Sequence, residues 1–357
     1  MGTPCSILVI NVGSTSTKVA VYDDTVPRLT ETLTYVADDL AQHATLRDQL
    51  PRREQDLTNF LQRYDIDPAS FDIVISRGGL GRPGPAGAYE INEIMCEDLL
   101  TGKYGIHPSA LGPAMALNLT RTRHIPAIVM DPPSTDEFEP IARFSGIPDI
   151  KRKSAFHALN QKAAARRTAS DIGTPYEKLN LIVAHLGGGI TIGAHRQGRV
   201  VDCTHGLTEG PFTPERAGTL PSLDLVGLAL SGIFDQGQLQ TRLVGRGGLA
   251  AYTGTTDAQQ IEAMINKGDE HARMVYRAMA YQIAKDIGAM AAVLTGQTDA
   301  IVLTGGLAHS AMLTAWVNER IHFIAPIYIY PGEDEMLSMA EGAVRVLQGK
   351  EPTMQYG

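Results

Sequence analysis

Residues 184–204, AHLGGGITIGAHRQGRVVDCT, constrain the fold of this chain more than any other stretch. An apolar run of β-forming residues over 179–184 stops at His185 and at three consecutive glycines, and two more β-like runs follow within 190–202. The pattern predicts a hairpin whose first turn carries no side chains. Glycine is needed where φ is positive or where a ligand must lie against the backbone, and exposed N–H groups in such a turn suit a phosphate. A tight hairpin that binds nothing is the alternative.

A second turn of the same kind occurs near the N-terminus, where an apolar strand is followed by the small polar segment NVGSTSTK, 11–18, and by another strand. Gly13 and Gly187 are 174 residues apart (187 − 13), close to half of the 357-residue chain, which indicates two similar halves. A third glycine-ended strand reads DAIVLTGG, 299–306. Three such strands predict a nucleotide held in a cleft between two domains.

Composition excludes several classes of protein. The formal net charge of −8 argues against a nucleic-acid partner and against an anionic membrane surface, because both require a basic face. The cysteines, Cys5, Cys96 and Cys203, have no metal-binding spacing and are expected to be free thiols in a reducing compartment. No apolar run is long enough to span a membrane, and the first residues do not resemble a signal peptide. We therefore expect a cytoplasmic protein.

Charged residues follow two predicted strands directly. Arg77 comes after the strand 71–76, beside two glycines, and Asp131 comes after the strand 125–130. Open α/β sheets bind their ligands beyond the carboxyl ends of such strands. A long loop rich in glycine and proline carries a further cation, Arg216, and loops of this length in compact domains are usually functional or disordered. Surface arginines near turns are the alternative.

Helical periodicity and capping signals predict the helices of the chain, which we place at about 38–64, 109–123, 158–171, 224–234, 255–266, 269–294, 308–320 and 336–347. His157 stands just before one of these helices, a place where a lone histidine is more often structural than catalytic. The acidic cluster 333–335 precedes the last helix. Its carboxylates either complement the helix dipole or hold a hard cation such as Mg²⁺.

Taken in order, the motifs resemble those of the acetate/butyrate kinases, the acetokinase family within the superfamily of actin, hexokinase and the Hsp70 ATPase domain. The matching segments are NVGSTSTK, SRGG, GIHP, Asp131, AFH, AHLGGGI, the Pro-Glu-Arg of the long loop, TGGLAH and the terminal acidic turn. The central turn has three glycines where acetate kinases usually have asparagine between two glycines. This difference, together with ITIGAHRQGRVVD, GPFTPERAGTLP, RAMAYQIAK and the short chain, is similar to the butyrate branch.

The resemblance implies an α/β fold of two duplicated actin-like (ribonuclease H-like) domains. Each has a five-stranded mixed sheet, and the nucleotide cleft lies between them. We expect domains at 1–155 and 156–357, with the last helix packed back on the first. The implied activity is reversible phosphorylation of a short-chain carboxylate by ATP, which makes the protein a phosphotransferase with a carboxyl acceptor. Butyrate is the expected substrate, with acetate, propionate and branched-chain acids as alternatives. The resemblance also implies a homodimer or a larger homo-oligomer.

Roles for single residues follow from the same resemblance. Arg77 and Arg216 flank the carboxylate and the phosphoryl group, while His157 and His185 donate hydrogen bonds to phosphoryl oxygens. Asp131 orients an arginine or the metal. The residues expected at the phosphates are Asn11, Ser14, Ser16, Lys18, Gly187, Gly188 and Gly189. Those expected at the adenosine are Asp257, Gly305, Gly306 and Leu307, those at Mg²⁺ are Glu335 and Asn11, and those at the carboxylate are Arg77 and His107.

The chemistry agrees with this assignment, since a carboxylate is already ionised at pH 7 and attacks phosphorus without a general base. Catalysis then reduces to in-line positioning and charge neutralisation, for which arginine is well suited. We expect the loop 80–88 and the turn 211–214 to wall the acyl pocket. Two other classes stay open. A sugar or polyol kinase needs an aspartate base, for which Asp131 is the only plausible residue, and an actin-like assembly or regulatory ATPase would ignore carboxylates.

Overall fold

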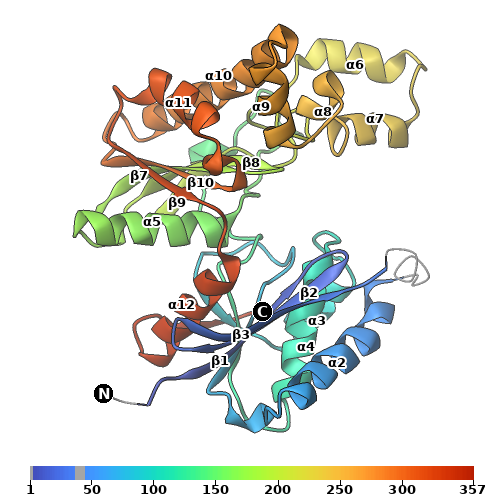
Figure 1. The fold of residues 1–357 in the computed structure, drawn as a ribbon, viewed down its shortest axis with the longest axis vertical. Coiled ribbons are helices and arrows are strands. Elements are labelled where there is room, and N and C mark those ends of the chain that lie inside the picture. The colour runs from blue at the N-terminus through green and yellow to red at the C-terminus, as the bar shows by residue number, and fades with distance from the viewer. Residues whose placement is uncertain (1–2, 37–44) are drawn as a thin grey trace. The chain divides into compact units, whose positions relative to one another are not determined.

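The computed structural model describes residues 3–36 and 45–357, which form two compact units (Figure 1). The first unit contains the chain up to Thr135 together with Asp334–Gly357, and the second is Asp136–Glu333. The last helix of the chain is therefore part of the first unit.

The predicted domain boundary after residue 155 differs from the observed division, because the segment 136–155 belongs to the second unit. Hydrogen bonds explain the difference. The Val200 N–H donates to Glu137 Oε2 at 2.8 Å, and the Glu139 N–H donates to the Val201 carbonyl at 3.0 Å. These bonds attach the segment to a strand of the second unit.

A mixed sheet forms the centre of the first unit. Its strands are β1 (Ser6–Val12), β2 (Ser16–Asp23), β3 (Val26–Thr34), β4 (Ile73–Ser76), β5 (Ala88–Glu90), β6 (Ala127–Met130) and β12 (Thr353–Gln355). Within the described ranges this sheet has seven strands in the order β12-β5-β6-β4-β1-β2-β3, so the predicted number of five was wrong here. The two extra strands, β5 and β12, have three residues each, too few for a periodic signal.

Helices cover both faces of this sheet, with α2, α3 and α4 on one face and α12 on the other (Figure 1). Their bounds are α2 (Leu46–Arg63), α3 (Glu93–Leu100), α4 (Leu111–Thr120) and α12 (Glu335–Leu347), with short 3₁₀ turns η1 (Pro68–Ser70) and η2 (Pro108–Ala110). Thr45 and Asp48 form a capping box that begins α2. The helix was predicted from about residue 38, and the part of that prediction over 38–44 lies outside the described residues.

The second unit has the same core connectivity as the first. Its strands are β7 (Asn180–Leu186), β8 (Ile190–Arg196), β9 (Arg199–Cys203), β10 (Ala300–Gly305) and β11 (Ile327–Pro331). In each unit an antiparallel three-stranded meander begins the sheet, and two parallel strands extend it on the side of the first strand. The predicted fold class, α/β with two mixed sheets, is confirmed.

Helix α5 covers one face of the second sheet, and the helices α8 to α11 lie on the other (Figure 1). The bounds are α5 (Ala158–Ile172), α6 (Ser222–Leu230), α7 (Gln236–Leu243), α8 (Gly248–Thr253), α9 (Ala258–Asn266), α10 (Glu270–Val293) and α11 (Ala311–Ile321), with 3₁₀ turns η3 (Pro140–Arg143), η4 (Tyr176–Lys178) and η5 (Gly306–His309). Helices α6 and α7 bury no residue. In the described parts of the chain, no helix is both long and apolar enough to cross a membrane.

Candidate functional site

Asn11, Arg77 and Glu335 meet in the first unit. Asn11 lies near the end of β1 and Arg77 follows the adjacent parallel strand β4, so both stand at the carboxyl edge of the sheet. The Arg77 Nη2 atom is 3.3 Å from Glu335 Oε1, and the Asn11 side-chain amide donates to Glu335 Oε2 at 2.8 Å. Glu335 is the first residue of α12, where the helix dipole favours a carboxylate. The acidic turn thus does more than cap a helix, because it orients Arg77.

His107 belongs to the same part of the first unit. Its Nδ1 lies 2.7 Å from the Ser109 hydroxyl oxygen and 3.2 Å from the Ser109 backbone nitrogen, and the hydroxyl oxygen lies 3.1 Å from the Gly78 carbonyl oxygen. Desolvation of the ring, followed by the positive charge of Arg77, lowers the pKa of His107. The ring is therefore neutral near pH 7 and can offer a hydrogen bond without adding a charge.

Asp131 is buried at the end of β6 and has a positive φ of 42°. Its Oδ1 accepts from the Gly87 N–H at 2.8 Å, and its own N–H donates to the Gly87 carbonyl at 3.0 Å. This pair of bonds holds the chain that enters β5, so the carboxylate has a structural task. Its role beside an arginine or a metal stays a prediction.

The turn between β1 and β2 is held by a residue that the sequence did not single out. Arg53 of α2 is fully buried and donates to the carbonyls of Ser14 and Ser16, each at 3.0 Å, and to Thr17 Oγ1 at 2.9 Å. Of the residues predicted to meet phosphate here, Ser14 and Lys18 are exposed and Ser16 is half-buried. Arg53 lies in a helix with many charges, so its sequence carries no signal of burial.

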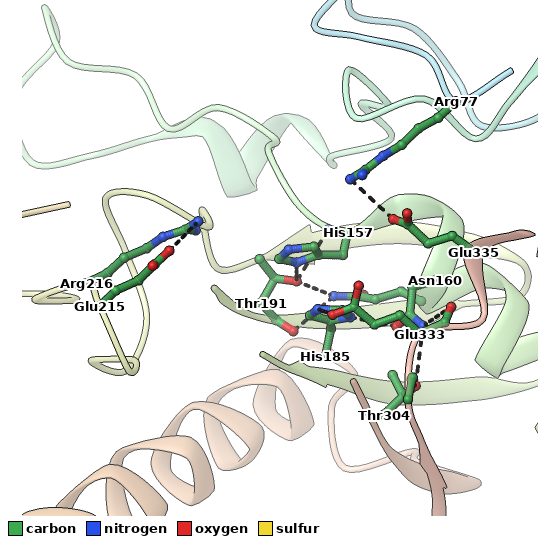
Figure 2. A network of polar contacts seen from close by, with 12 residues as sticks. Arg77, His157, Asn160, His185, Thr191, Glu215, Arg216, Thr304, Glu333 and Glu335 are labelled. Atoms are coloured by element: carbon green, nitrogen blue, oxygen red, sulfur yellow. Dashed lines mark hydrogen bonds and ion pairs between the residues drawn. The ribbon is translucent and has the colours of Figure 1, made fainter. Parts of the chain in front are cut away.

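His157 and His185 lie against each other in the second unit (Figure 2). Their rings are stacked with centroids 3.8 Å apart and planes 13° apart. His185 is the penultimate residue of β7 and is almost completely buried, with Nδ1 2.7 Å from Asn160 Oδ1. His157 precedes α5, and its Nδ1 is 2.9 Å from Thr191 Oγ1. Two of the predicted motifs, AFH and AHLGGG, are therefore brought together by the structure.

The residues around this pair could have been found in part from spacing. Asn160 stands three residues after His157 and thus on the same face of α5. Thr191 is the cross-strand partner of His185 in the β7–β8 hairpin. Glu333, which follows β11, places Oε1 3.3 Å from His185 Nε2 (Figure 2). The sequence analysis identifies Glu333 only as one member of the acidic cluster 333–335.

The glycine turn makes room for side chains. A β-carbon on Gly189 would lie 2.3 Å from Arg216 Nη1, and one on Gly188 would lie 3.5 Å from Glu215 Oε1. A β-carbon on Gly187 would lie 3.2 Å from His185 Nε2 and 3.3 Å from Glu333 Oε1. None of these three described glycines is in the left-handed region. Close approach by Arg216, and not a positive φ, is therefore what requires glycine at 189.

Arg216 is four-fifths buried against this turn (Figure 2). Its Nη1 donates to the Gly206 carbonyl at 2.6 Å, and its Nη2 lies 3.6 Å from Glu215 Oε1. Burial lowers the pKa of Arg216, and Glu215 opposes that change. The Nε–H is buried and has no hydrogen-bond partner among the residues that the structure describes. Arg216 is thus a desolvated cation with an unused donor.

The residues predicted at the adenosine have backbone or capping tasks. Gly305 has φ of 88°, and a β-carbon there would lie 2.4 Å from the Leu186 carbonyl oxygen, so only glycine fits. Gly306 begins η5, which also contains Leu307. Asp257 is exposed and caps α9 by accepting from the Gln259 N–H at 2.8 Å. Their contact with a nucleotide stays a prediction.

The fit of the residues to Mg²⁺ depends on Glu335 and Asn11. Over residues 3–36 and 45–357, no group of three His, Cys, Asp or Glu side chains is placed to hold a metal. Protein sites for Mg²⁺ commonly supply one or two carboxylates and leave the other positions to water and substrate phosphates. Glu335 meets this requirement, with Asn11 already bonded to it. The residues therefore fit a metal that arrives with a nucleotide.

A sequence model of the acetokinase family matches residues 148–326, half of the chain. Similar solved structures are Porphyromonas gingivalis acetate kinase (19% identity, 96% of this chain and 100% of that one, TM-score 0.78) and Entamoeba histolytica acetate kinase (16%, 97% and 98%, 0.75). A third similar structure is a propionate kinase from Francisella tularensis subsp. tularensis SCHU S4, with 17% identity over 95% of this chain and 98% of that one and a TM-score of 0.74. At these identities the structures establish the fold alone. On the evidence of the family match, the chain belongs to the acetokinase family, a family of carboxylate phosphotransferases.

Proposed function

We propose that this protein transfers the γ-phosphoryl group of ATP to a short-chain carboxylate, giving an acyl phosphate and ADP in a reversible reaction. A carboxylate oxygen attacks the γ-phosphorus, and the bond from that phosphorus to the β,γ-bridging oxygen breaks. The bridging oxygen leaves with ADP, and no proton moves. The observation that carries this proposal is the buried Arg216 guanidinium with its unused Nε–H beside the glycine turn. A desolvated cation of this kind suits the charge that spreads over a transferring phosphoryl group.

Each named residue then has one physical task. Arg77 binds the substrate carboxylate, and its ion pair with Glu335 holds the guanidinium in place between turnovers. His107, neutral beside Arg77, offers a hydrogen bond to the same carboxylate. Arg216 and His157 neutralise charge on the phosphoryl oxygens.

Glu335 and Asn11 would hold Mg²⁺ that enters with the nucleotide. When bound, the metal neutralises phosphate charge. Because the Glu335 carboxylate also pairs with Arg77, a metal held there would share this carboxylate with the guanidinium.

We infer that the preferred acid has four carbons and that its alkyl chain enters a cavity of the first unit. The cavity begins at Gly78, next to Arg77 in the chain, and is also lined by Gly81, Leu99 and Tyr356. Its floor is fixed because the Arg82 N–H donates to the Tyr356 hydroxyl at 2.7 Å. The free space is on the scale of a water-sized group or slightly more. Such a space suits one or two additional carbons and excludes a long chain.

The cavity also agrees with part of the pocket predicted from the sequence, since Gly81 and Arg82 belong to the loop 80–88. Tyr356 was not anticipated. It is the penultimate residue of the chain, and its hydroxyl donates to Asp98 Oδ2 at 3.2 Å, while Asn92 donates to its carbonyl at 2.7 Å. The participation of the turn 211–214 stays a prediction.

We further propose that the protein acts as a homodimer whose contact includes α6. Leu223, Leu230 and Ile233 are exposed by 87%, 82% and 67%. An apolar face left in water commonly marks a protein–protein contact. Residues 218–234 contain one charged side chain, Asp224, so a second copy can pack there with little like-charge repulsion.

The segment 217–244, which contains α6 and α7, begins directly after Arg216, and its last residue, Val244, pairs with Arg216. The Ala217 N–H donates to the Leu243 carbonyl at 2.9 Å, and the Gly245 N–H donates to the Glu215 carbonyl at 2.8 Å. A partner that covers α6 would therefore also steady the Arg216 loop. Dissociation of the dimer into monomers should therefore lower the specific activity.

A hydroxamate assay for acyl phosphate tests the main proposal, with Mg-ATP and acetate, propionate, butyrate, isobutyrate or valerate. Highest kcat/KM on butyrate, abolished in Arg216→Ala but not in the exposed control Arg123→Ala, is the expected result. Faster ADP formation with glycerol or a hexose than with any acid would favour a hydroxyl kinase. Nucleotide-dependent assembly without acyl phosphate would favour an actin-like ATPase.

A further inference from the structure

A continuous row of hydrogen bonds crosses the interior of the second unit and ends at His157. Tyr176 OH lies 2.7 Å from His195 Nδ1, and His195 Nε2 lies 3.0 Å from Gln161 Oε1. Gln161 Nε2 donates to Thr191 Oγ1 at 2.9 Å, and that oxygen lies 2.9 Å from His157 Nδ1. Gln161, Thr191 and His195 are completely buried. A buried polar row that is satisfied along its length is rigid.

Gly193, in the middle of β8, makes space for this row. A β-carbon on Gly193 would lie 2.5 Å from Gln161 Oε1 and 3.2 Å from His195 Nε2. Glycine weakens a strand interior and often marks a close approach of another group. The glycine in ITIGAHR is thus explained by the row and not by the turn of the hairpin.

The orientation of the Gln161 amide follows from the Thr191 carbonyl. Gln161 Nε2 donates to that carbonyl at 3.0 Å, and since a carbonyl oxygen can only accept, the amide nitrogen must face Thr191. Gln161 Oε1 therefore faces His195 and accepts from its Nε2–H. Burial, with the positive charges of Lys162 and Arg166 adding to it, lowers the pKa of His195 well below its ordinary value. His195 is neutral, and its Nδ1 accepts from the Tyr176 hydroxyl.

The Thr191 hydroxyl fixes the next proton in the row. Its oxygen accepts from Gln161 Nε2 and, at 3.4 Å, from the His157 backbone N–H. In the described part of the chain, the one recorded acceptor for the hydroxyl proton is His157 Nδ1. His157 Nδ1 must therefore be unprotonated, and a neutral His157 carries its proton on Nε2.

We propose that Gln161 and Thr191 are positioning residues that hold His157 as the Nε2–H tautomer, so that it always presents a donor to the phosphoryl oxygens. This inference rests on the proposed function for its catalytic meaning. Gln161 sets the direction of every hydrogen bond in the row. If its amide were flipped, Gln161 Oε1 would face the Thr191 carbonyl oxygen, and two acceptors would then oppose each other.

His185, which stacks on His157, is held with its proton on the other ring nitrogen, Nδ1. Asn160 Nδ2 donates to the Glu333 carbonyl at 3.3 Å, so Asn160 Oδ1 accepts from His185 Nδ1–H. His185 Nε2 then donates only when the ring is an imidazolium, with the Glu333 carboxylate 3.3 Å away. The two histidines thus differ as donors, and His157 is the one that donates in its neutral form.

Nitrogen NMR of protein labelled with ¹⁵N at histidine tests the tautomer directly. The His157 signals are assigned by their loss in His157→Gln. We expect Nδ1 to show the shift of an unprotonated ring nitrogen and Nε2 that of a protonated one. A ring protonated at Nδ1 in the wild-type protein would overturn the proposal, whether or not the protein phosphorylates carboxylates.

Kinetics of matched variants test the catalytic meaning. Thr191→Val removes the hydroxyl proton and should lower kcat for acyl phosphate formation about 10- to 100-fold, with little change in KM for the acid. Thr191→Ser keeps the hydroxyl and should restore both kcat and the His157 shifts. Thr168→Val removes a buried hydroxyl of α5, the helix that carries Gln161. This hydroxyl donates to the Ala164 carbonyl outside the row, so its loss should not affect kcat.

An unchanged kcat in Thr191→Val, or an equal loss in Thr168→Val, would contradict the positioning role. Thermal unfolding of all three variants separates a loss of folded protein from a loss of rate. If the wild-type protein forms no acyl phosphate at all, the proposed function fails, while the NMR measurement still decides the tautomer.

Discussion

Arg216 occupies the space in which Gly189 would carry a side chain, since a β-carbon there would lie 2.3 Å from Arg216 Nη1. The obstructing atom is the end of a flexible side chain, so Gly189→Ala should fold and push the guanidinium away from the turn. We expect kcat/KM for the acid to fall about 100-fold or more, the size of loss typical when one transition-state donor is removed. Steady-state kinetics with Mg-ATP and butyrate measure this.

The neighbouring glycine supplies the comparison. A β-carbon on Gly188 would lie 3.5 Å from Glu215 Oε1, which is an ordinary contact. Gly188→Ala should therefore lose far less activity than Gly189→Ala. Equal losses would mean that the backbone of the turn, and not the position of Arg216, limits the reaction.

Arg53 should matter for both stability and nucleotide binding. Arg53→Met removes the hydrogen bonds of the guanidinium to the Ser14 and Ser16 carbonyls, and the Ser16 carbonyl keeps only the Gly13 N–H, at 2.8 Å. A hydrogen bond that involves a charged group contributes about 1.5–3 kcal/mol. We expect the midpoint of urea unfolding to fall in this variant. We also expect the KM for ATP to rise more than the KM for the acid. Arg52→Met, which removes the exposed ion pair with Asp56, should change stability by no more than about 0.5 kcal/mol. An unchanged KM for ATP in Arg53→Met would show that the β1–β2 turn does not contribute to nucleotide binding.

The cavity at Gly81 should set the preferred chain length. A β-carbon on Gly81 would lie 3.2 Å from the Tyr356 hydroxyl and would narrow the cavity. Gly81→Ala should lower kcat/KM for butyrate about 10-fold or more relative to acetate, since one methylene is worth roughly 1–3 kcal/mol. Gly146→Ala, where an added β-carbon meets nothing within 4 Å, is the control. If the ratio of kcat/KM for acetate to that for butyrate is unchanged in Gly81→Ala, the alkyl chain of the substrate does not enter this cavity.

Charge on the apolar face of α6 should separate the subunits. In an isolated chain, Leu223→Glu and Leu230→Glu would expose a polar group where an apolar one was already in water, so neither should unfold the protein. We expect sedimentation equilibrium to show half the wild-type mass, together with reduced specific activity. Val26→Glu, at a residue of β3 that is 65% exposed, should keep the wild-type mass. A wild-type monomer would exclude this contact.

The parts of the fold with strong local signals were predictable. Apolar runs that stop at glycine located β1, β7 and β10, and the spacing of Gly13 and Gly187 reflected the shared connectivity of the two sheets. Strand β3 was missed because its few apolar residues stand among charged and polar ones in VPRLTETLT, and none of its residues is buried. The three-residue strands β5 and β12 depend on pairing partners far away in the chain, which a local pattern does not contain.

The candidate site was predictable residue by residue but not as a set of contacts. Glycine, arginine and histidine at strand ends identified Gly189, Arg216 and His185 separately. Their contacts depend on how a loop folds over a hairpin, which no spacing encodes. Arg53 could not be found, because only tertiary packing distinguishes it from the exposed arginine at position 52.

Asp286 of α10 should make stability depend on pH. Burial raises the pKa of Asp286 to about 6, with Lys285 partly opposing this change and Glu209 adding to it. In the unfolded chain an aspartate has a pKa of about 3.9. The folded state therefore holds this proton more tightly, and the contribution of Asp286 to stability is fully present below about pH 4 and is lost as the pH rises through about 6.

Asp286→Asn removes this titration. Above pH 6 the variant should be more stable than the wild type by up to about 3 kcal/mol, and near pH 4 the two should converge. Urea unfolding at several pH values between 4 and 8 measures the difference. Glu270→Gln, an exposed change on the same helix, should follow the wild-type curve, because its carboxylate stays in water in both states. A constant difference between Asp286→Asn and wild type across this range would show that the Asp286 carboxyl does not titrate in it, since only a group that changes charge between the two pKa values can bend the curve.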